Sequence, residues 1–316
     1  MRVLTTFKTK ERIKEDFEST FPSVTFDWRN SIEESEQTID QAEVLVTYGV
    51  DLTDEWIEKA KQLKWIMVLS AGIDDMPLDT IAEKGIQVTN SRGISAGPMS
   101  EYAISMILQV ERNAKELMEH EKNHVWSRKV KMNEISGKTM LVTGTGAIGQ
   151  EVARLSKAFR MKTIGVSKSG RAKDHFDETY TIEQLNDQLP EADYVVNVLP
   201  ATNETEKTFG RKQFQVMKKE AIFLNMGRGV TVNEAELIEA LNDGEIAHAI
   251  LDVMEEEPLP AESPLWDMEN TTLTPHLSGI SRHYQPRGFE IFKQNLDAYL
   301  KGEEFPLNQI DVKRGY

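Results

Sequence analysis

The segment from Lys138 to Gly149 constrains the fold more than any other part of the chain. It begins with a short, mainly apolar run that predicts a strand, and it continues into a Gly-x-Gly-x-x-Gly turn. Apolar side chains then recur at helical spacing, which predicts an amphipathic helix with one buried face: Ile148, Val152, Leu155 and Phe159. A strand, a glycine turn and a helix in this order predict a doubly wound α/β domain that binds the pyrophosphate of a dinucleotide.

Each glycine of the turn has its own expected part in that site. Gly144 permits the tight turn, Gly146 lets the backbone approach a phosphate, and Gly149 lets the helix pack against the strand. The start of the helix offers N–H groups and the positive end of its dipole to the anion. The alternative is an ordinary glycine-rich connection between a strand and a helix. The dinucleotide interpretation predicts cofactor contacts from Gly144, Thr145, Gly146, Ala147, Ile148 and Gly149.

Length and charge limit the classes of function. The chain has 316 residues, which predicts about two domains. It carries 52 acidic and 37 basic residues, a net charge of −15, which opposes binding to nucleic acid and to anionic membranes. No apolar run approaches the about 18 residues that a spanning helix needs. Cysteine is absent, which excludes disulfides and thiolate metal sites and fits a cytoplasmic location; we expect no bound metal.

Short apolar strands alternate with helical patterns along almost the whole chain, which predicts parallel sheets covered by helices. The strands expected before the glycine turn are 3–6, 24–26, 44–47, 65–69 and 87–89. Those expected after it are 161–166, 194–199, 221–225, 249–252 and 272–274. A long helix is expected to begin at Pro98, a residue that suits the first helical position, and a final helix is expected over 289–300.

Polar residues that follow strands are the candidates for chemistry, because ligands of open α/β sheets bind beyond the carboxyl ends of the strands. Arg228, between two glycines, suits a carboxylate, or it is a surface arginine in a turn. Asp252 is placed to touch a cofactor, whereas the triplet Glu255–Glu257 has the composition of a solvated turn. His276 suits proton transfer, although a lone loop histidine is often incidental. The segment 70–74 offers backbone N–H groups to an anion, or is a plain turn.

Together these segments resemble the D-isomer-specific 2-hydroxyacid dehydrogenases, a family that includes glyoxylate/hydroxypyruvate reductases and phosphoglycerate dehydrogenases. The resemblance covers nearly the whole chain apart from its N-terminal part. It rests on blocks that occur in the family's order: Ser70-Ala71-Gly72-Ile73-Asp74, Ser100-Glu101-Tyr102-Ala103, the glycine turn, Asn197–Thr202, Asn225–Gly229, Asp252–Pro258, Leu259–Trp266 and Thr274–Gly279.

The resemblance implies two doubly wound parallel-sheet domains with a cleft between them. A Rossmann cofactor domain over 96–283 would be inserted into a discontinuous, flavodoxin-like substrate domain made of 1–95 and 284–316. It also implies a homodimer through the region 98–130. The alternative for the apolar side chains of that region is packing within one chain.

The resemblance also assigns a catalytic group, which falls on Arg228, Glu257 and His276. His276 would take the hydroxyl proton as a hydride leaves C2, or donate it during reduction. Glu257 would hold the imidazole by a hydrogen bond and favour its protonated form. Arg228 would bind the substrate carboxylate and the C2 oxygen, and the N–H groups of Ala71 and Gly72 would complete the grip on that carboxylate.

The implied cofactor contacts extend beyond the glycine turn, with Asp252 meeting the nicotinamide carboxamide. They comprise Ser167, Lys168, Ser169, Arg171, Leu199, Pro200, Thr205, Met226, Gly227, Asp252, His276, Ser278 and Gly279. One departure matters, because NAD-specific members carry an acidic residue where this chain has Ser167. A hydroxyl followed by Lys168 and Arg171 suits the 2′-phosphate of NADP, so NADP is expected over NAD. The alternative is that both cations are solvated loop charges.

The expected activity is that of an NAD(P)-dependent D-2-hydroxyacid dehydrogenase, which transfers a hydride between the dinucleotide and a small 2-hydroxy or 2-keto acid. A glyoxylate/hydroxypyruvate-type reductase is favoured. A D-3-phosphoglycerate dehydrogenase-like enzyme is the alternative within the class, but the substrate loop adds no obvious cation for a phosphate and the length leaves no room for a C-terminal regulatory domain. A dinucleotide-gated corepressor-like binding module is the alternative from another class, which the acidic composition disfavours.

Overall fold

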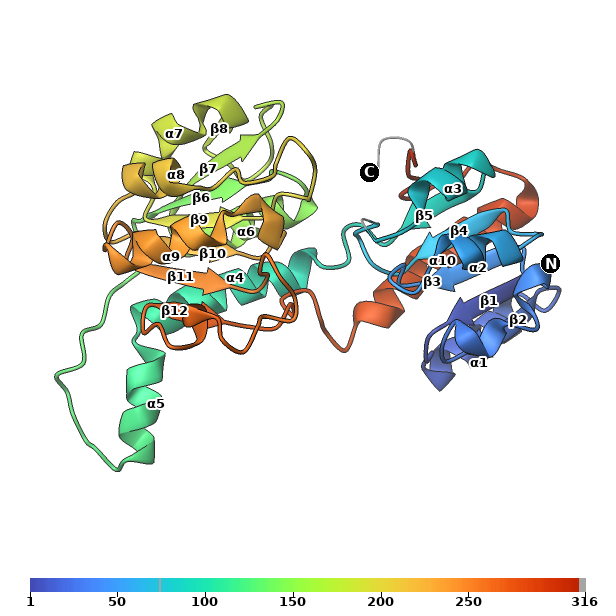
Figure 1. The fold of residues 1–316 in the computed structure, drawn as a ribbon, viewed down its shortest axis with the longest axis horizontal. Helices are drawn as coiled ribbons and strands as arrows, with labels where there is room; N and C mark the ends of the chain where they lie inside the picture. The colour runs from blue at the N-terminus through green and yellow to red at the C-terminus, as the bar shows by residue number, and fades with distance from the viewer. Residues whose placement is uncertain (74, 313–316) are drawn as a thin grey trace. The chain divides into compact units, whose positions relative to one another are not determined.

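All paired strands of the two sheets run parallel, as the nearly continuous apolar strand segments predict. The computed structural model describes residues 1–73 and 75–312. Its chain divides into two units, each built on one sheet (Figure 1). Unit 1 comprises Met1–Ser95 and Ser281–Tyr316, and unit 2 comprises Ala96–Ile280. The chain therefore passes between the units twice, at 95–96 and at 280–281, where the sequence predicts 95–96 and 283–284.

Unit 1 contains a five-stranded sheet in the order β2-β1-β3-β4-β5. This is the flavodoxin-like order, which confirms the expected topology. Its strands are β1 (Arg2–Thr6), β2 (Thr25–Arg29), β3 (Val44–Thr47), β4 (Trp65–Val68) and β5 (Gln87–Asn90).

Unit 2 contains a seven-stranded sheet in the order β12-β11-β10-β9-β6-β7-β8. Its first strand, β6, lies inside the sheet, with later strands added on both sides, which is the Rossmann arrangement extended by one strand. The strands are β6 (Thr139–Thr143), β7 (Lys162–Ser167), β8 (Glu178–Thr181), β9 (Tyr194–Asn197), β10 (Ile222–Asn225), β11 (His248–Leu251) and β12 (Thr271–Leu273).

Helices connect the strands of both units. They are α1 (Glu11–Thr20), α2 (Asp54–Lys59), α3 (Leu78–Glu83), α4 (Ala96–Glu111), α5 (Ala114–Lys122), α6 (Ala147–Ala158), α7 (Leu185–Gln188), α8 (Arg211–Val216), α9 (Glu234–Asn242) and α10 (Tyr284–Lys301). Short 3₁₀ turns occur at Glu33–Ser35, Ile39–Gln41, Ile182–Gln184, Leu189–Glu191, Gly229–Thr231 and Pro264–Trp266. Within the described part of the chain, no helix combines the length and apolarity needed to cross a bilayer.

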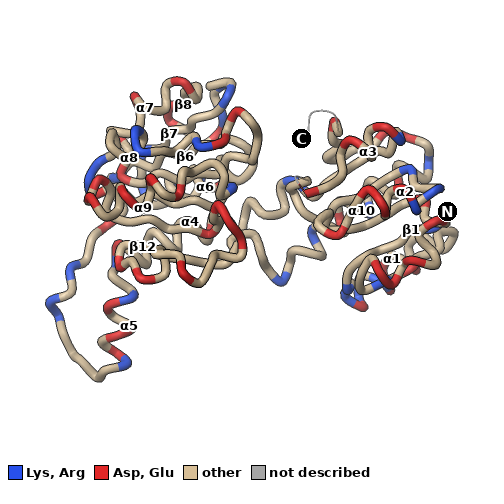
Figure 2. The backbone as a smooth tube through the Cα atoms, in the orientation of Figure 1, with Lys and Arg blue, Asp and Glu red and all other residues tan. Residues whose placement is uncertain are grey.

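Each sheet is buried on both faces, because successive strand residues point to opposite sides and both sides are covered. In unit 2, Leu141 and Val195 pack with α8 and α9, whereas Met140 and Val196 pack with α4 and α6 on the other face. In unit 1, α2 and α3 cover one face, and α1 and α10 cover the other. Figure 2 shows the charged residues concentrated on the surface helices and loops that surround these cores.

Four local expectations are wrong. No strand is expected at β8, because its half-exposed, polar residues give no apolar signal. Pro98 is the third residue of α4 rather than its first, a position in the first turn that still needs no helical N–H partner. Phe159 is 40% exposed because α6 ends one residue earlier, so Val152, Ala153 and Ser156 form the buried face. The last helix begins at Tyr284 and is longer than expected.

The glycine turn packs its backbone very closely. Gly144 has a φ of 100°, a conformation that side chains rarely adopt. A Cβ atom on Gly149 would lie 2.0 Å from the carbonyl oxygen of Gly144, so α6 approaches the turn as closely as its backbone allows. At Gly146, by contrast, no described atom lies within 4 Å of the Cβ position.

This contrast predicts losses of stability of different size for two alanine substitutions. Gly149→Ala forces α6 away from β6 and should lower the free energy of unfolding by about 1–3 kcal/mol, as overpacking does. Gly146→Ala should lower it by about 1 kcal/mol or less, because its methyl group enters open space at a helix cap. Urea unfolding followed by circular dichroism measures both values. Equal stability of the Gly149→Ala variant and the unchanged protein would contradict the packing argument.

Candidate active site

The carboxyl ends of the unit 2 strands bring most of the predicted site residues to one edge of the sheet. The glycine turn follows β6, Ser167 ends β7, and Leu199 follows β9. Arg228, Asp252 and Thr274 follow β10, β11 and β12. The order of strands reverses between β6 and β9, and open α/β sheets bind ligands at such a reversal.

The turn after β6 has the geometry that a pyrophosphate needs. Gly144 N–H donates to the carbonyl of Val166 at 2.8 Å, which ties the turn to β7. α6 begins after Gly146 without a capping side chain and carries no acidic residue in its first turn. Its first N–H groups and its positive dipole end are therefore suited to an anion at the open position beside Gly146.

The loop after β7 holds the residues expected near the adenosine ribose. Ser167 Oγ is buried and has no hydrogen-bond partner among the described residues, which suits a ligand hydroxyl or phosphate oxygen. Lys168 Nζ lies 2.6 Å from a carboxylate oxygen of Glu204, and both side chains are mostly exposed. Arg171 is exposed as well, and its N–H donates to Ser169 Oγ at 3.4 Å.

The loops after β9 and β10 lie against each other. A Cβ atom on Gly227 would lie 2.6 Å from the carbonyl oxygen of Leu199, so the two backbones are in close contact. Thr205 Oγ1 donates to the carbonyl of Pro200 at 2.6 Å and accepts from the N–H of Thr202 at 2.9 Å, which closes the loop after β9 on itself.

A buried chain of amides and hydroxyls supports these loops from below. Thr143 Oγ1 donates to Asn197 Oδ1 at 2.8 Å, and Asn197 Nδ2 donates to Asn225 Oδ1 at 2.9 Å and to Thr231 Oγ1 at 2.7 Å. Thr231 Oγ1 then donates to the carbonyl of Arg228 at 2.6 Å. These four supporting side chains are at most 1% exposed, so each depends on the others for its hydrogen bonds.

Arg228 is half-buried, and its Nη1 donates to the carbonyl of Gly227 at 2.9 Å. The next residue joins this loop to the loop after β11, because a Cβ atom on Gly229 would lie 1.7 Å from the carbonyl oxygen of Met254. Met254 N–H in turn donates to Glu257 Oε1 at 3.1 Å. Backbone contact thus connects the arginine loop to the loop that carries Glu257.

His276 and Glu257 form a direct pair. His276 Nδ1 lies 2.8 Å from Glu257 Oε2, and the side chains are 52% and 36% exposed. Because a carboxylate only accepts hydrogen bonds, Nδ1 carries the proton and Nε2 remains available to a ligand. The pair has the composition and geometry of a general acid–base couple.

Asp252 holds the loop of His276 in place. The carboxylate is fully buried; its Oδ1 accepts from Thr274 Oγ1 at 2.5 Å and from Leu277 N–H at 3.0 Å, and its Oδ2 accepts from Ser278 N–H at 3.0 Å. Its backbone carbonyl accepts from His276 N–H at 2.8 Å. The expected contact between Asp252 and a nicotinamide carboxamide stays a prediction; the contacts in the structure are with this loop.

Ala71 and Gly72 belong to unit 1. Asn90 Nδ2 donates to the carbonyl of Ala71 at 2.6 Å, and Ser70 Oγ donates to the carbonyl of Gly72 at 2.8 Å, so side chains hold the backbone of this loop. Asp74, the last residue of the segment, lies outside the described residues. Among residues 1–73 and 75–312, no group of three or more His, Asp or Glu side chains is arranged to hold a metal ion.

The profile of the family described as "D-isomer specific 2-hydroxyacid dehydrogenase, NAD binding domain" matches residues 104–278, more than half of the chain. The chain belongs to this family. It therefore carries an NAD(P)-binding domain and is an oxidoreductase of the 2-hydroxyacid dehydrogenase type. The matched residues include the glycine turn, Arg228, Glu257 and His276.

Relatives with assigned activities fall into two groups. The glyoxylate reductase of Aeropyrum pernix is 32% identical over 275 residues, which are 84% of this chain and 82% of that protein. The D-3-phosphoglycerate dehydrogenase of Methanocaldococcus jannaschii is 35% identical over 276 residues, which are 86% of this chain but only 52% of that longer protein.

Solved structures share the fold over nearly the full length. A D-isomer specific 2-hydroxyacid dehydrogenase family protein from Aeromonas salmonicida is 34% identical, with a TM-score of 0.91, and the match covers 98% of this chain and 99% of that one. The NADPH-dependent glyoxylate/hydroxypyruvate reductase of Sinorhizobium meliloti, solved with NADP and sulfate, is 27% identical with a TM-score of 0.83, and the match covers 100% and 99% of the two chains.

Several residues that support this dehydrogenase site are not marked as functional by any motif in the sequence. Thr143 ends the strand predicted before the glycine turn, and Tyr102 is one of the apolar-face positions of the helix predicted from Pro98. Thr231 lies outside every predicted element, and Thr274 directly follows β12. The periodicity of polar residues at successive strand ends is the one available signal, since Thr143, Asn197 and Asn225 each close a buried strand.

Proposed function

We propose that this chain is an NAD(P)-dependent reductase of small 2-keto acids of the glyoxylate and hydroxypyruvate class, with His276 as its proton donor. The observation that carries the proposal is the 2.8 Å contact between His276 Nδ1 and Glu257 Oε2 at the carboxyl edge of a Rossmann sheet. A proton carrier at this edge lies in the same unit as a phosphate turn that fits a dinucleotide.

The residues divide the chemistry among them. When bound, the reduced dinucleotide supplies a hydride to the carbonyl carbon of the substrate. His276, with Nδ1–H held by Glu257, donates the proton on Nε2 to the carbonyl oxygen, and in the reverse direction it accepts the hydroxyl proton. The Glu257 carboxylate stabilises the imidazolium that donates this proton.

Arg228 supplies the fixed positive charge of the site. Its planar guanidinium suits a carboxylate that lies next to the reacting carbonyl. The buried hydrogen bonds from Asn225 and Thr231 to the carbonyl of Arg228 keep its backbone from shifting when substrate enters or leaves. The N–H groups of Ala71 and Gly72 are our candidates for the second grip on the substrate carboxylate.

The substrate class rests on the named relatives. Glyoxylate reductases and glyoxylate/hydroxypyruvate reductases recur among the relatives that match over most of their own length, whereas the phosphoglycerate dehydrogenase of M. jannaschii is matched over about half of its length. A 3-phosphoglycerate dehydrogenase activity is therefore the second candidate.

We propose NADP as the preferred cofactor. No carboxylate stands at the end of β7, where Ser167 Oγ is buried and unpartnered among the described residues. Lys168 pairs with Glu204, but exposed ion pairs contribute only about 0–1 kcal/mol, so a phosphate dianion competes well for this lysine. The related S. meliloti reductase, whose structure holds NADP, supports the same preference.

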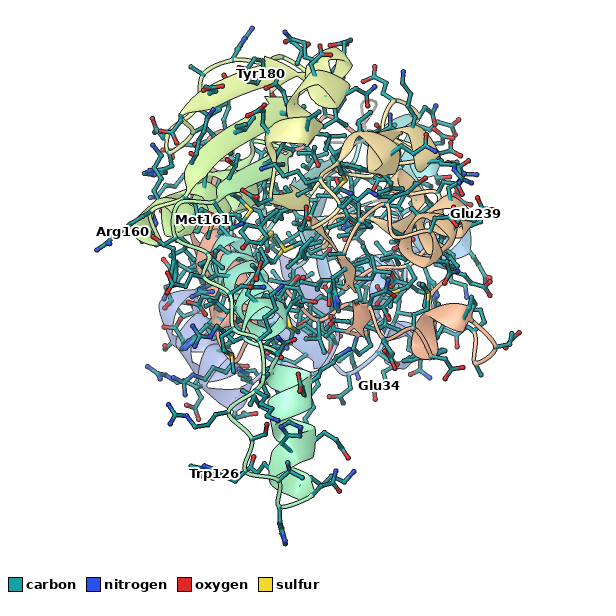
Figure 3. All side chains as sticks on the ribbon, turned by 90° about the vertical axis from the view of Figure 1, so that its left-hand side faces the viewer. Glu34, Trp126, Arg160, Met161, Tyr180 and Glu239 are labelled. Atoms are coloured by element: carbon teal, nitrogen blue, oxygen red, sulfur yellow. The ribbon has the colours of Figure 1, made fainter. Side chains whose placement is uncertain are left out.

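We also propose a homodimer through the region 98–130. None of the residues of α5 is buried, and Figures 1 and 3 show this helix extending away from the sheet of unit 2, with Trp126 in the segment that follows it. Large apolar side chains are exposed along this arm: Leu117, Met118, Val125 and Trp126, the last with an exposed fraction of 96%. A second copy of the chain is the occupant that would cover them, because such side chains gather at interfaces between subunits.

The proton-transfer role predicts the effect of His276→Asn. Asparagine tolerates the left-handed backbone of this position, where φ is 51°, but its side-chain amide neither gains nor gives up a proton near neutral pH. We expect the kcat for glyoxylate to fall about 10²- to 10⁴-fold while the dinucleotide still binds. His175→Asn is the matched control, because His175 is an exposed loop histidine of unit 2 with a φ of 69°.

The assay follows absorbance of the reduced nicotinamide with glyoxylate, hydroxypyruvate and 3-phosphohydroxypyruvate as substrates. Unchanged turnover in His276→Asn would refute the assignment. A kcat/KM that is highest for 3-phosphohydroxypyruvate would support the second candidate instead. Tight dinucleotide binding without oxidation by any 2-keto acid would contradict an enzyme and favour a dinucleotide-gated binding module.

The cofactor proposal predicts a higher kcat/KM for NADPH than for NADH. Glu204→Gln removes the carboxylate that pairs with Lys168 and should raise kcat/KM for NADPH up to about fivefold, with NADH little affected. Glu206→Gln is the control, because it removes an equal charge two residues away. Ser167→Asp should reverse the preference, since a carboxylate there repels a 2′-phosphate. A higher kcat/KM for NADH in the unaltered protein defeats the proposal.

The dimer proposal predicts a solution mass twice that of one chain. Replacing two apolar side chains of the arm, as in the double variant Met118→Glu and Trp126→Glu, should yield monomers because charges would be buried in the interface. Phe159→Glu is the control, since Phe159 is also an exposed apolar residue of unit 2 but lies at the end of α6. Light scattering after gel filtration measures the masses, and a monomeric unaltered protein contradicts the proposal.

A further inference from the structure

A buried tyrosine hydroxyl reaches the loop of His276 from the helix that begins unit 2. Tyr102 lies in α4, and its hydroxyl is 2.7 Å from Thr274 Oγ1, which lies 2.5 Å from Asp252 Oδ1. Tyr102 is 8% exposed and Asp252 is fully buried. The three side chains form a continuous hydrogen-bonded chain inside unit 2, and neither the proposed mechanism nor the dinucleotide turn uses Tyr102.

The direction of these hydrogen bonds follows from the donors present. Both oxygens of Asp252 accept backbone N–H groups, from Leu277 and Ser278, so the carboxylate is an acceptor toward Thr274 as well. Thr274 has one hydroxyl proton and gives it to Asp252. Its oxygen must therefore accept from Tyr102, which is the donor at the start of the chain.

The surroundings of Tyr102 favour this donor role. Burial raises the pKa of the Tyr102 hydroxyl well above its ordinary value; the hydrogen bond with Thr274 acts in the opposite direction and the nearby charge of Asp252 in the same direction, and the effect of burial is the largest of the three. Tyr102 consequently keeps its proton throughout the range in which a histidine titrates.

His276 lies between the loop residues that are hydrogen-bonded to Asp252. Thr274 binds Asp252 on one side of the histidine, and Leu277 and Ser278 bind it on the other. Between them, His276 N–H donates to the Asp252 carbonyl, and its backbone has a φ of 51°. A non-glycine residue in that conformation costs roughly 1–3 kcal/mol, so it persists only where its neighbours are fixed.

We propose that Tyr102 is a positioning residue for proton transfer, acting on His276 through Thr274 and Asp252. This inference rests on the proposed role of His276 as the proton donor. The hydroxyl of Tyr102 fixes the rotamer of Thr274, Thr274 and the two amides fix the loop on Asp252, and the loop directs the imidazole toward Glu257. Unit 2 ends at residue 280, four positions after His276. Few later residues of the unit can therefore hold the loop, and Asp252 does so.

Tyr102→Phe tests the proposal by removing one oxygen atom and keeping the ring. We expect kcat to fall about tenfold, because small displacements of a catalytic group are costly, while the substrate KM and the dinucleotide Kd change less than about twofold. Tyr194→Phe is the matched control. Tyr194 is 1% exposed, packs in the same core, and donates at 2.7 Å to Glu111, another residue of α4. It is the first residue of β9, whereas the histidine loop follows the carboxyl end of the parallel strand β12.

Substitutions at Thr274 test whether Tyr102 acts on His276 through the hydrogen bonds of Thr274 and Asp252. Thr274→Val should lower kcat at least as much as Tyr102→Phe, and Thr274→Ser, which keeps the hydroxyl, should restore it. Adding Tyr102→Phe to Thr274→Val should cause no further loss, because the link is already broken. Losses that multiply in the double variant would overturn the proposal.

A measurement that needs no turnover separates this inference from the proposed function. The ¹⁵N resonances of the His276 imidazole, identified by their absence in His276→Asn, should shift in Tyr102→Phe and stay unchanged in Tyr194→Phe. If the unaltered protein reduces no 2-keto acid, the proposed function fails while these resonances still decide whether Tyr102 positions the ring. Unchanged resonances in Tyr102→Phe, or an equal loss of kcat in Tyr194→Phe, would overturn the positioning role.

Discussion

The register between β10, β11 and β12 is the constraint on which the candidate active site depends. Asn225 pairs with Leu251, and Leu251 pairs with Leu273, so the three strands end at one level of the sheet. The chain then needs only short loops to carry an arginine, a glutamate and a histidine to the same edge. A shift of one strand by one residue would turn its side chains to the other face and separate the histidine from its carboxylate.

Buried polar groups fix the conformation of the loops that follow these strands. A buried amide or carboxylate without partners is costly, so the polar side chains beneath the site stabilise the fold only in the arrangement that satisfies all of them. A hydrogen bond between Asn197 and Asn225 joins the starts of the loops after β9 and β10, and Asp252 accepts hydrogen bonds from the loop after β12. The same hydrogen bonds that keep these groups satisfied therefore also orient Arg228 and His276.

The amino-acid sequence predicts most of this fold because buried parallel strands and glycine turns have strong local patterns. It fails where the pattern is weak. β8 is a half-exposed strand of polar and aromatic residues at the edge of its sheet, so neither alternation nor an apolar run marks it. Phe159 follows the helical period of α6 but lies one residue past the end of the helix, where it is 40% exposed. The candidate site was recognisable through its ordered motifs, whereas its supporting residues, such as Thr231 and Tyr102, look like ordinary core positions.

By itself, the sequence determined the order of the buried strands, the place of the phosphate turn and the strand ends from which chemistry could arise. These depend on local backbone preference and on the period of burial, which neighbouring residues encode. The family resemblance pointed to Glu257 as the partner of His276, but only the tertiary structure gives the physical reason: Glu257 contacts His276, while Glu255 binds through its N–H to Glu234. Three consecutive carboxylates are chemically alike, and the path of the loop, set by contact between Gly229 and Met254, selects one of them. Long-range contacts of this kind leave no periodic trace in the chain.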